Sequence, residues 1–277
     1  MVVGRGRLTF GIRTVGIKMK NKKSLGQHWL KNRVILDEIA DLAAGNGAEG
    51  SASVSSEKPE LVVEIGPGLG TLTGSLLKRF NRVIAVEYDK NLAENLPKSF
   101  PGKNLEVINA DILDCDFDDL PQPYSVAGNI PYYITSPIIE KLLKVENKPE
   151  RIVLLIQKEV AERIAGDKET MLSLFVKNYV NVELGPVVGR AEFTPPPKVD
   201  SQVIVLRPHA PVVKEEVFGL VRQGFSAPRK KLIHNLAGLK SKEELTFIFA
   251  KLGVDIDARP GDLYLSDWQK MYDEISK

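Results

Sequence analysis

The sequence predicts an α/β fold followed by a small helical domain. Short apolar runs typical of buried strands recur at 61–65, 82–86, 105–109, 124–127, 151–156 and 199–206. Helical patterns separate the early runs, and this alternation favours a parallel sheet with crossover connections. Beyond Pro208 and Pro211 only helical patterns remain, at 212–225, 231–236, 243–252 and 266–275. We therefore expect a Rossmann-like sheet domain over residues 21–207 and a helical domain over residues 208–277.

The N-terminal segment is basic. Residues 1–23 carry seven Lys or Arg side chains and no acidic one. Such an arm can lie along phosphate groups. A targeting sequence and an extension upstream of a start at Met19 are the alternatives. We expect residues 1–20 to be disordered, Asn32 to cap a helix that carries Ile35, Ile39 and Leu42, and a Gly/Ala/Ser-rich spacer to occupy residues 45–59.

A glycine-rich turn follows the strand at 61–65. It reads Gly66-Pro67-Gly68-Leu69-Gly70, and the next strand ends at Glu87, 21 residues after Gly66. Strand, glycine turn, helix, strand and terminal carboxylate form a nucleotide-binding unit in which Glu87 can accept both ribose hydroxyls. Thr71 stands where a dinucleotide fingerprint has its third small residue. This departure favours a ligand with adenine and ribose but no pyrophosphate, such as S-adenosylmethionine.

A further carboxylate follows the strand at 105–109. Asp111 can accept the amino group of the cofactor's adenine, because the carboxyl ends of such strands line one crevice. A helix cap or a loop carboxylate is the alternative for Asp111. The nearby run Asp114-x-Asp116-x-Asp118 does not match a calcium loop, since position 6 is Asp119 and position 12 is Ser125. Three widely spaced histidines give no metal-ligand pattern, so no metal is expected.

The stretch Asn129-Ile130-Pro131-Tyr132 carries the most chemistry. The Asn129 side-chain oxygen and the Pro131 carbonyl can each accept an N–H bond from an exocyclic amino group, and Tyr132 can stack on a base. Two such acceptors would localise the lone pair of adenine N6. The stretch therefore points to alkyl transfer to an amino nitrogen. The alternative is a strand-to-helix turn capped by Ser136, with Pro137 in the first helical position.

Composition limits the classes of protein. Apolar residues make up 43% of the chain, enough for a substantial core, and Cys115 is the single cysteine, which excludes an intramolecular disulfide framework. No apolar run approaches the length of a membrane span. The net charge of +2 does not by itself argue for RNA binding. A local cluster is more informative: Arg222, Arg229, Lys230, Lys231 and His234.

Five ordered motifs, from about Lys20 to the end of the chain, resemble the KsgA family of rRNA adenine N6,N6-dimethyltransferases. They are the segments 22–30, 64–73, 129–132, 193–201 and 225–231. The resemblance implies a class I methyltransferase domain and methyl transfer from S-adenosylmethionine to adenines near the 3′ end of small-subunit rRNA. It also implies a role in ribosome biogenesis and a small-subunit precursor as partner. The single cysteine suits a reducing compartment, and we expect a cytoplasmic location and a monomer.

The resemblance also assigns site residues. It implies that the cofactor contacts are His28, Leu30, Gly66, Glu87, Asp111 and Asn129. The target adenine would be held by Asn129, Pro131, Tyr132 and Phe193. RNA contacts are expected at Arg222, Arg229, Lys230 and Lys231.

Two departures and two rival functions accompany the resemblance. The opening motif has His28-Trp29 where the family usually has Asn-Phe, and the loop at 166–170 lacks the usual Tyr-Gly. Erm-type methyltransferases of large-subunit rRNA share the catalytic motif, although the segments 195–201 and 229–231 favour the KsgA type. The other alternative is a non-enzymatic ribosome-assembly factor, which the intact Asn129 motif disfavours.

Overall fold

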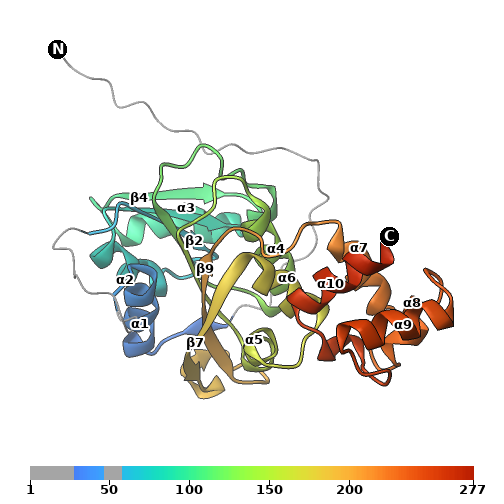
Figure 1. The fold of residues 1–277 in the computed structure, drawn as a ribbon. Helices are drawn as coiled ribbons and strands as arrows, with labels where there is room; N and C mark the ends of the chain where they lie inside the picture. The colour runs from blue at the N-terminus through green and yellow to red at the C-terminus, as the bar shows by residue number, and fades with distance from the viewer. Residues whose placement is uncertain (1–27, 47–57) are drawn as a thin grey trace, which may run out of the picture. The chain divides into compact units, whose positions relative to one another are not determined.

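The computed structural model describes residues 28–46 and 58–277. The basic arm at 1–20, most of the opening motif and most of the spacer at 45–59 lie outside the described residues. The described chain divides into two units (Figure 1). The first contains residues 28–46, 58–161 and 183–208, and the second contains residues 162–182 and 209–277. Each unit has its own apolar core.

A seven-stranded sheet forms the centre of the first unit, in the order β4-β3-β2-β5-β6-β9-β7. The strands are β2 (Leu61–Ile65), β3 (Arg82–Glu87), β4 (Leu105–Asn109), β5 (Tyr124–Asn129), β6 (Arg151–Gln157), β7 (Val180–Val188) and β9 (Ser201–Pro208). Strands β4, β3, β2, β5 and β6 are parallel, as predicted. Strand β9 runs antiparallel to β6, with Leu154 opposite Ile204, so the sheet is mixed. The antiparallel direction of β9 was not predicted, because side-chain alternation indicates a strand but not its direction. The chain enters β9 without a crossover helix.

Helices cover the sheet of the first unit. They are α1 (Arg33–Ala43), α2 (Thr71–Arg79), α3 (Lys90–Ser99), α4 (Thr135–Lys144) and the first turn of α5 (Lys158–Ala165). Asn32 caps α1 as predicted, because its side chain accepts hydrogen bonds from the backbone N–H groups of Val34 and Ile35. Helices α1 and α2 lie side by side (Figure 1). Arg79 of α2 joins them through ion pairs with Asp37 and Asp41 of α1.

The apolar core of the first unit lies between α1, α2 and one face of the sheet. Alternate strand residues point to this face, including Val62, Val83, Ala127 and Val153, and Ile39 of α1 packs in the same cluster. This is the period of two expected for a strand with one face against a helix layer.

A two-stranded sheet lies beside the larger one in the chain's first unit. It pairs β1 (Trp29–Leu30) with β8 (Phe193–Thr194) in antiparallel register, with Leu30 opposite Phe193. The Lys31 N–H donates to the Glu192 carbonyl at 3.0 Å and extends the pairing. This pairing brings the start of the described chain next to a segment more than 160 residues away in sequence.

The second unit is mainly helical. It contains α6 (Met171–Tyr179), α7 (Val217–Gly224), α8 (Leu232–Leu236), α9 (Lys242–Leu252) and α10 (Leu265–Ile275). Trp268 and Phe249 are buried at its centre. Residues 162–182 belong to this unit, whereas the sequence placed them with the sheet domain. The reason is packing, because Leu174 of α6 lies in the same apolar cluster as Trp268.

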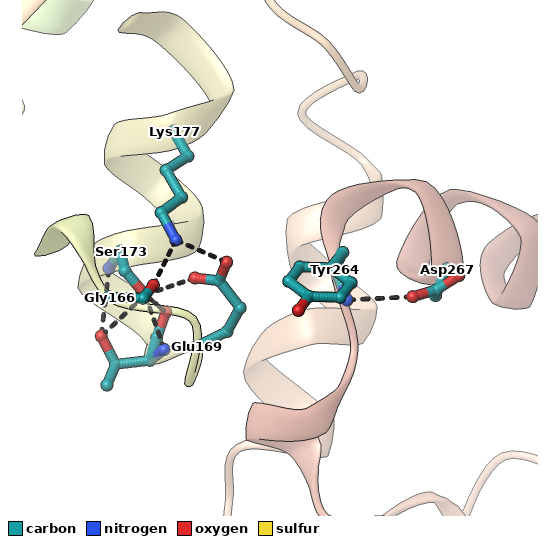
Figure 2. A network of polar contacts seen from close by, with 7 residues as sticks. Gly166, Glu169, Ser173, Lys177, Tyr264 and Asp267 are labelled. Atoms are coloured by element: carbon teal, nitrogen blue, oxygen red, sulfur yellow. Dashed lines mark hydrogen bonds and ion pairs between the residues drawn. The ribbon is translucent and has the colours of Figure 1, made fainter. Parts of the chain in front are cut away.

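A buried ion pair holds the loop before α6. The Glu169 carboxylate accepts from Lys177 Nζ at 2.7 Å and from Ser173 Oγ at 2.6 Å, and Lys177 also donates to the Gly166 carbonyl at 2.7 Å. Figure 2 shows these side chains converging on the Glu169 carboxylate. Thr170 and Ser173 form a capping box at the start of α6. Both carboxylate oxygens of Glu169 are therefore engaged within the second unit.

Three findings concern membrane helices, metal ligands and the cysteine. No helix in the described part of the chain is long and apolar enough to cross a membrane. Within residues 28–46 and 58–277, no group of three or more His, Cys, Asp or Glu side chains could hold a metal ion. Cys115 is buried, and burial raises the pKa of its thiol to about 12.

Candidate functional site

A cavity of about 450 Å³ lies in the first unit, where the carboxyl ends of β2, β3, β4 and β5 meet. The predicted residues that line it are His28, Gly66, Glu87, Asp111, Asn129, Pro131 and Tyr132. These residues come from segments about 100 positions apart in sequence. The fold thus brings the glycine turn, the two acidic strand ends and the Asn129 stretch to one place, as the sequence predicted.

The glycine turn forms one wall of the cavity. Gly66, Gly68 and Gly70 all have a positive φ, between 57° and 81°, which favours glycine. A Cβ atom at Gly70 would lie only 2.7 Å from a side-chain carbon of Leu96, so this position also lacks room. At Gly66 a Cβ atom would meet no atom within 4 Å. The turn can therefore be approached closely by a ligand at Gly66.

Glu87 fixes the shape of this turn. One carboxylate oxygen accepts from the Gly68 N–H at 3.0 Å, and the other accepts from the Asp89 N–H at 2.8 Å. Burial raises the pKa of Glu87, and the two backbone N–H groups oppose this shift. Because each carboxylate oxygen has two lone pairs, each can still accept one further bond. Glu87 can therefore hold two neighbouring hydroxyl groups while it supports the turn.

Glu64, at the end of β2, also lines the cavity, and the sequence did not single it out. It is only 1% exposed, and burial raises its pKa to about 8, against the hydrogen bond that Thr73 Oγ1 donates at 2.6 Å. Its carboxyl group is therefore largely protonated at neutral pH. Glu64 could have been identified from the sequence, because burying a carboxyl group in an otherwise apolar strand costs free energy, and such groups are found at functional sites.

Of the two alternatives for Asp111, the structure shows the cap, and the contact with adenine stays a prediction. Its side chain caps the short turn η2 (Ile112–Asp114) by accepting from the Leu113 N–H at 2.9 Å, which confirms the cap. It also lines the cavity, next to Tyr88, Ile112 and Tyr133. The sequence missed these three residues, although Tyr88 and Ile112 directly follow the two predicted carboxylates. They give this end of the cavity flat and apolar walls.

The Asn129 side chain has a defined orientation. Its Nδ2 donates to the backbone carbonyl of His28 at 2.8 Å. The amide nitrogen therefore points to the chain preceding β1, and Oδ1 keeps its lone pairs for another donor. His28 contributes through its main chain here, while its ring nitrogen Nδ1 lies 2.7 Å from the Pro195 carbonyl. This arrangement places a free acceptor at the cavity wall.

Pro131 and Tyr132 follow directly. The Pro131 carbonyl accepts from the Ile134 N–H at 3.2 Å and keeps a second lone pair. The Tyr132 hydroxyl lies 2.7 Å from Ser201 Oγ, and its ring stacks near the His28 ring at a centroid distance of 6.1 Å. Both contacts hold the Tyr132 ring in place. The Tyr132 pKa is raised, mainly by burial.

The expected turn into the next helix is present, but its details differ. Helix α4 begins at Thr135, one residue before the predicted cap Ser136, and no side chain caps it. A single turn of 3-10 helix, η3 (Tyr132–Ile134), precedes it and shifts the helix start. Such a short turn has no sequence period that would reveal it.

Two predicted site residues do not line the cavity. Leu30 and Phe193 are both buried in the apolar core of the first unit, where they pair across β1 and β8. Their side chains support the segment that carries His28 and Trp29. The sequence could not distinguish a contact from a support, because the pairing joins two strands of two residues each.

The predicted RNA contacts lie in the second unit. Arg222 is exposed in the last turn of α7, and Arg229, Lys230 and Lys231 are exposed in the segment before α8. Lys231 forms an ion pair with Asp257. The connection between α7 and α8 is fixed by Asn235, whose Nδ2 donates to the carbonyls of Gly224 and Ala227. The exposed cations are therefore carried on an ordered segment.

Comparison with known proteins places the chain in a family. A family model described as ribosomal RNA adenine dimethylase matches residues 18–277. Two relatives named ribosomal RNA small subunit methyltransferase A are similar to the chain. The one from Dehalococcoides mccartyi (strain CBDB1) is 36% identical and covers 92% of this chain and 89% of its own. The one from Synechocystis sp. (strain ATCC 27184 / PCC 6803 / Kazusa) is 38% identical and covers 90% and 94%.

Two solved structures share the fold of the chain. The 23S rRNA methyltransferase ErmE has a TM-score of 0.71 and 27% identity, over 90% of this chain and all of its own. A dimethyladenosine transferase from Plasmodium falciparum has a TM-score of 0.69 and 28% identity, over 90% and 98%. The fold is that of a class I methyltransferase, as predicted.

Proposed function

Because the chain belongs to the ribosomal RNA adenine dimethylase family, we propose that Asn129 is the residue closest to the reacting nitrogen. The chain is an S-adenosylmethionine-dependent rRNA adenine N6,N6-dimethyltransferase that acts on small-subunit rRNA. The observation that carries the assignment is the bond from Asn129 Nδ2 to the His28 carbonyl, because it leaves Oδ1 free to accept from an amino group.

The order of the strands gives the cofactor a direction. Asp111 follows β4, Glu87 ends β3, the glycine turn follows β2 and Asn129 ends β5. Adenine at Asp111 and ribose at Glu87 would place the sulfur and the amino-acid end at the glycine turn. The residues fit such a ligand, because Glu87 has two lone pairs left for the ribose and the turn is open at Gly66. The methyl group would then face Asn129.

The target adenine would be held by three groups. The Oδ1 of Asn129 and the second lone pair of the Pro131 carbonyl would accept the two N6 hydrogens, and Tyr132 would stack on the ring. The bound cofactor supplies an electrophilic methyl group, so alignment is the main contribution of the protein. As the N6–carbon bond forms and the sulfur–methyl bond breaks, positive charge would move from sulfur to N6, where the two oxygens would stabilise it. The methylated N6 would then lose one proton, and the cofactor would leave as S-adenosylhomocysteine.

Leu30 and Phe193 have a supporting role in this proposal. Both are buried and paired with each other. They would hold β1 so that the His28 carbonyl meets Asn129. We thus place Phe193 among the positioning residues rather than among the groups that touch adenine.

We further propose that the second unit contributes to RNA binding through Arg222, Arg229, Lys230 and Lys231. All four are exposed cations, and phosphate groups are their natural partners. A precursor of the small ribosomal subunit as substrate, action in the cytoplasm and a monomeric state belong to the same proposal.

One assay separates this function from its rivals. The protein and labelled S-adenosylmethionine would be incubated with purified small subunits, large subunits and free rRNA, all from a source lacking the modification. We expect label only in small-subunit rRNA, as N6,N6-dimethyladenine, and an initial rate of labelling about 10²–10³-fold lower with the Asn129→Ala variant. Label in the large subunit would instead support an Erm-type activity. Subunit binding without any label would support a non-enzymatic assembly factor.

A further inference from the structure

The indole N–H of Trp29 is a buried donor without a partner in the described chain. Trp29 belongs to β1 and is one of the residues that line the cavity. Leaving a buried N–H unpaired costs about 1–3 kcal/mol. Native proteins rarely accept this cost without a reason, and a ligand that supplies the missing acceptor is one such reason.

The position of this N–H is well defined. A Cβ atom built on Gly68 would lie 3.0 Å from Trp29 Nε1, so the indole nitrogen rests against the glycine turn. Gly68 is itself held by the Glu87 carboxylate, at 3.0 Å from its N–H. The backbone of Trp29 is fixed on the other side by its pairing with Thr194 in β8. The donor is therefore anchored against the glycine turn that follows β2.

This end is where the amino-acid part of the cofactor would lie. In the proposed orientation, adenine lies at Asp111, ribose at Glu87 and the amino-acid end at the glycine turn after β2. That part of the cofactor carries a carboxylate, which accepts hydrogen bonds, and an ammonium group, which only donates. Only the carboxylate can satisfy an indole N–H.

We propose that Trp29 Nε1–H donates a hydrogen bond to the carboxylate at the amino-acid end of the bound cofactor. This makes Trp29 a cofactor-specificity residue: it distinguishes a complete cofactor from adenosine derivatives without the amino-acid end. The inference rests on the proposed function, since it uses the same cavity and the same orientation.

The charge around Trp29 is compatible with an anion. Glu64 lines the same end of the cavity, and a charged carboxylate there would repel the ligand's carboxylate. Burial raises the pKa of Glu64 to about 8, so this group is mostly neutral at pH 7. The neighbouring N-terminus of α2 also favours negative charge, because Gly70 at its cap has no side chain to satisfy the first N–H groups.

Two ligands and one conservative variant test the proposal. S-adenosylhomocysteine carries the amino-acid end, whereas 5′-methylthioadenosine has the same adenosine and thioether without it. Trp29→Phe keeps an aromatic ring and removes the N–H. By isothermal titration calorimetry we expect Trp29→Phe to weaken S-adenosylhomocysteine about tenfold, as for loss of a bond to a charged group. Its affinity for 5′-methylthioadenosine should stay within about twofold of the unmodified protein.

Trp268→Phe is the matched control. Trp268 is the other tryptophan of the chain, its indole N–H is also buried and unpaired, and it lies in the core of the second unit. This variant should leave the affinity for both ligands unchanged. Equal weakening of both ligands by Trp29→Phe would mean that Trp29 only shapes the cavity, and unchanged affinity would mean that the bond is absent. Either result overturns the proposal.

A spectroscopic test needs no substitution in the cavity. The protein has two indole N–H groups, which give two resonances in a ¹H–¹⁵N spectrum, and Trp268→Phe assigns them. We expect S-adenosylhomocysteine to move the Trp29 signal downfield beyond the shift caused by 5′-methylthioadenosine, with Trp268 unmoved. The same Trp29 shift with both ligands would overturn the proposal. If the unmodified protein binds neither ligand, the cofactor assignment itself fails, and the Trp29 proposal with it.

Discussion

Glu64 in the first unit and Glu169 in the second are both buried carboxyl groups, 1% and 4% exposed, but their surroundings differ. Glu169 is neutralised by Lys177 and accepts from Ser173, so both of its oxygens are engaged. Glu64 accepts from Thr73, through both its hydroxyl and its backbone N–H, and it lines a cavity. A buried carboxylate whose two oxygens are paired with a cation and a hydroxyl has a structural role. A buried carboxyl group at the wall of a cavity instead indicates a ligand-binding site.

The largest effect is expected where the pairing in the second unit is broken. Lys177→Met removes the cation and leaves Glu169 buried without compensation, which should lower the free energy of unfolding by about 3–5 kcal/mol. Urea denaturation would measure this loss. The double variant Glu169→Gln/Lys177→Met should recover part of it. A loss below about 1 kcal/mol would mean that Glu169 is not structurally important and would erase the contrast with Glu64.

At the cavity, Asn129→Ala should lower the rate of methyl transfer and leave the stability of the fold largely unchanged. Removing one donor that stabilises the developing charge of an oxyanion lowers a rate about 10²–10³-fold, and we expect the same scale for this acceptor. We expect this fall in the single-turnover rate of methyl transfer at saturating cofactor, with unchanged affinity for rRNA. Asn129→Asp, which keeps Oδ1, is the comparison. A near-normal rate for Asn129→Ala would exclude Asn129 from the transfer step.

Glu87 both supports the glycine turn and faces the cavity, so it combines the structural role of Glu169 with the ligand-binding role proposed for the cavity. Glu87→Ala should weaken S-adenosylmethionine by about 1.5–3 kcal/mol, because hydrogen bonds to a charged group are lost. Isothermal titration would measure the change. Glu87→Gln keeps one acceptor for the Gly68 N–H, so it separates support of the turn from contact with ribose. Unchanged affinity in Glu87→Ala would remove this residue from the site.

Glu64 should make the stability of the ligand-free protein depend on pH. Its folded-state pKa, about 8, lies above the ordinary value of 4.5, so the folded protein binds more protons than the unfolded chain between these values. The free energy of unfolding should therefore fall as pH rises from about 5 to 8, by up to about 1.4 kcal/mol per pH unit.

Glu64→Gln isolates this contribution. Glutamine has nearly the same shape and cannot lose a proton, so the variant should have a flatter profile in denaturation experiments across this pH range. Glu87, whose pKa is also raised, still contributes in both proteins. The difference between the two profiles therefore belongs to Glu64. Parallel profiles would show that Glu64 is already ionised.

The smallest effect concerns the exposed cations of the second unit. Replacing Arg229, Lys230 and Lys231 with Ala should weaken rRNA binding and reduce its salt dependence, because fewer counterions are released. Lys231 already pairs with Asp257. The double variant that keeps Lys231 should therefore give most of the change, a slope of log affinity against log salt smaller by about 1.5. Cofactor affinity is the control. An unchanged slope with lower cofactor affinity would exclude the RNA role.

The sequence predicted the elements with strong periodicity and the residues at their ends. The strands Leu61–Ile65 and Leu105–Asn109 were placed correctly to the residue, because apolar runs bounded by glycine or polar residues define them. Glu87 followed from the strand, glycine turn, helix and strand pattern of a nucleotide-binding unit, and Asp111 from the rule that parallel strands end at one crevice. Asn129 followed from its own stretch, whose acceptors suit an amino group.

Two of the features that were not predicted depend on contacts between segments that are distant in sequence. The pairing of Leu30 with Phe193 joins strands of two residues, which have no detectable period. The bond from Asn129 to the His28 carbonyl involves the main chain, which no side-chain pattern encodes. Strand β7 contains Gly185 and Pro186 and was not predicted, because both residues are unusual within a strand.

Cys115 has a practical consequence for experiments on this protein. It is the single cysteine of the chain, it is buried, and its pKa of about 12 leaves almost no thiolate near neutral pH. A maleimide dye or a nitroxide should therefore react at an introduced surface cysteine with little background. Val199 in the first unit and Phe247 in the second are exposed positions for such a pair of labels. Energy transfer between them would follow the separation of the two units while RNA binds.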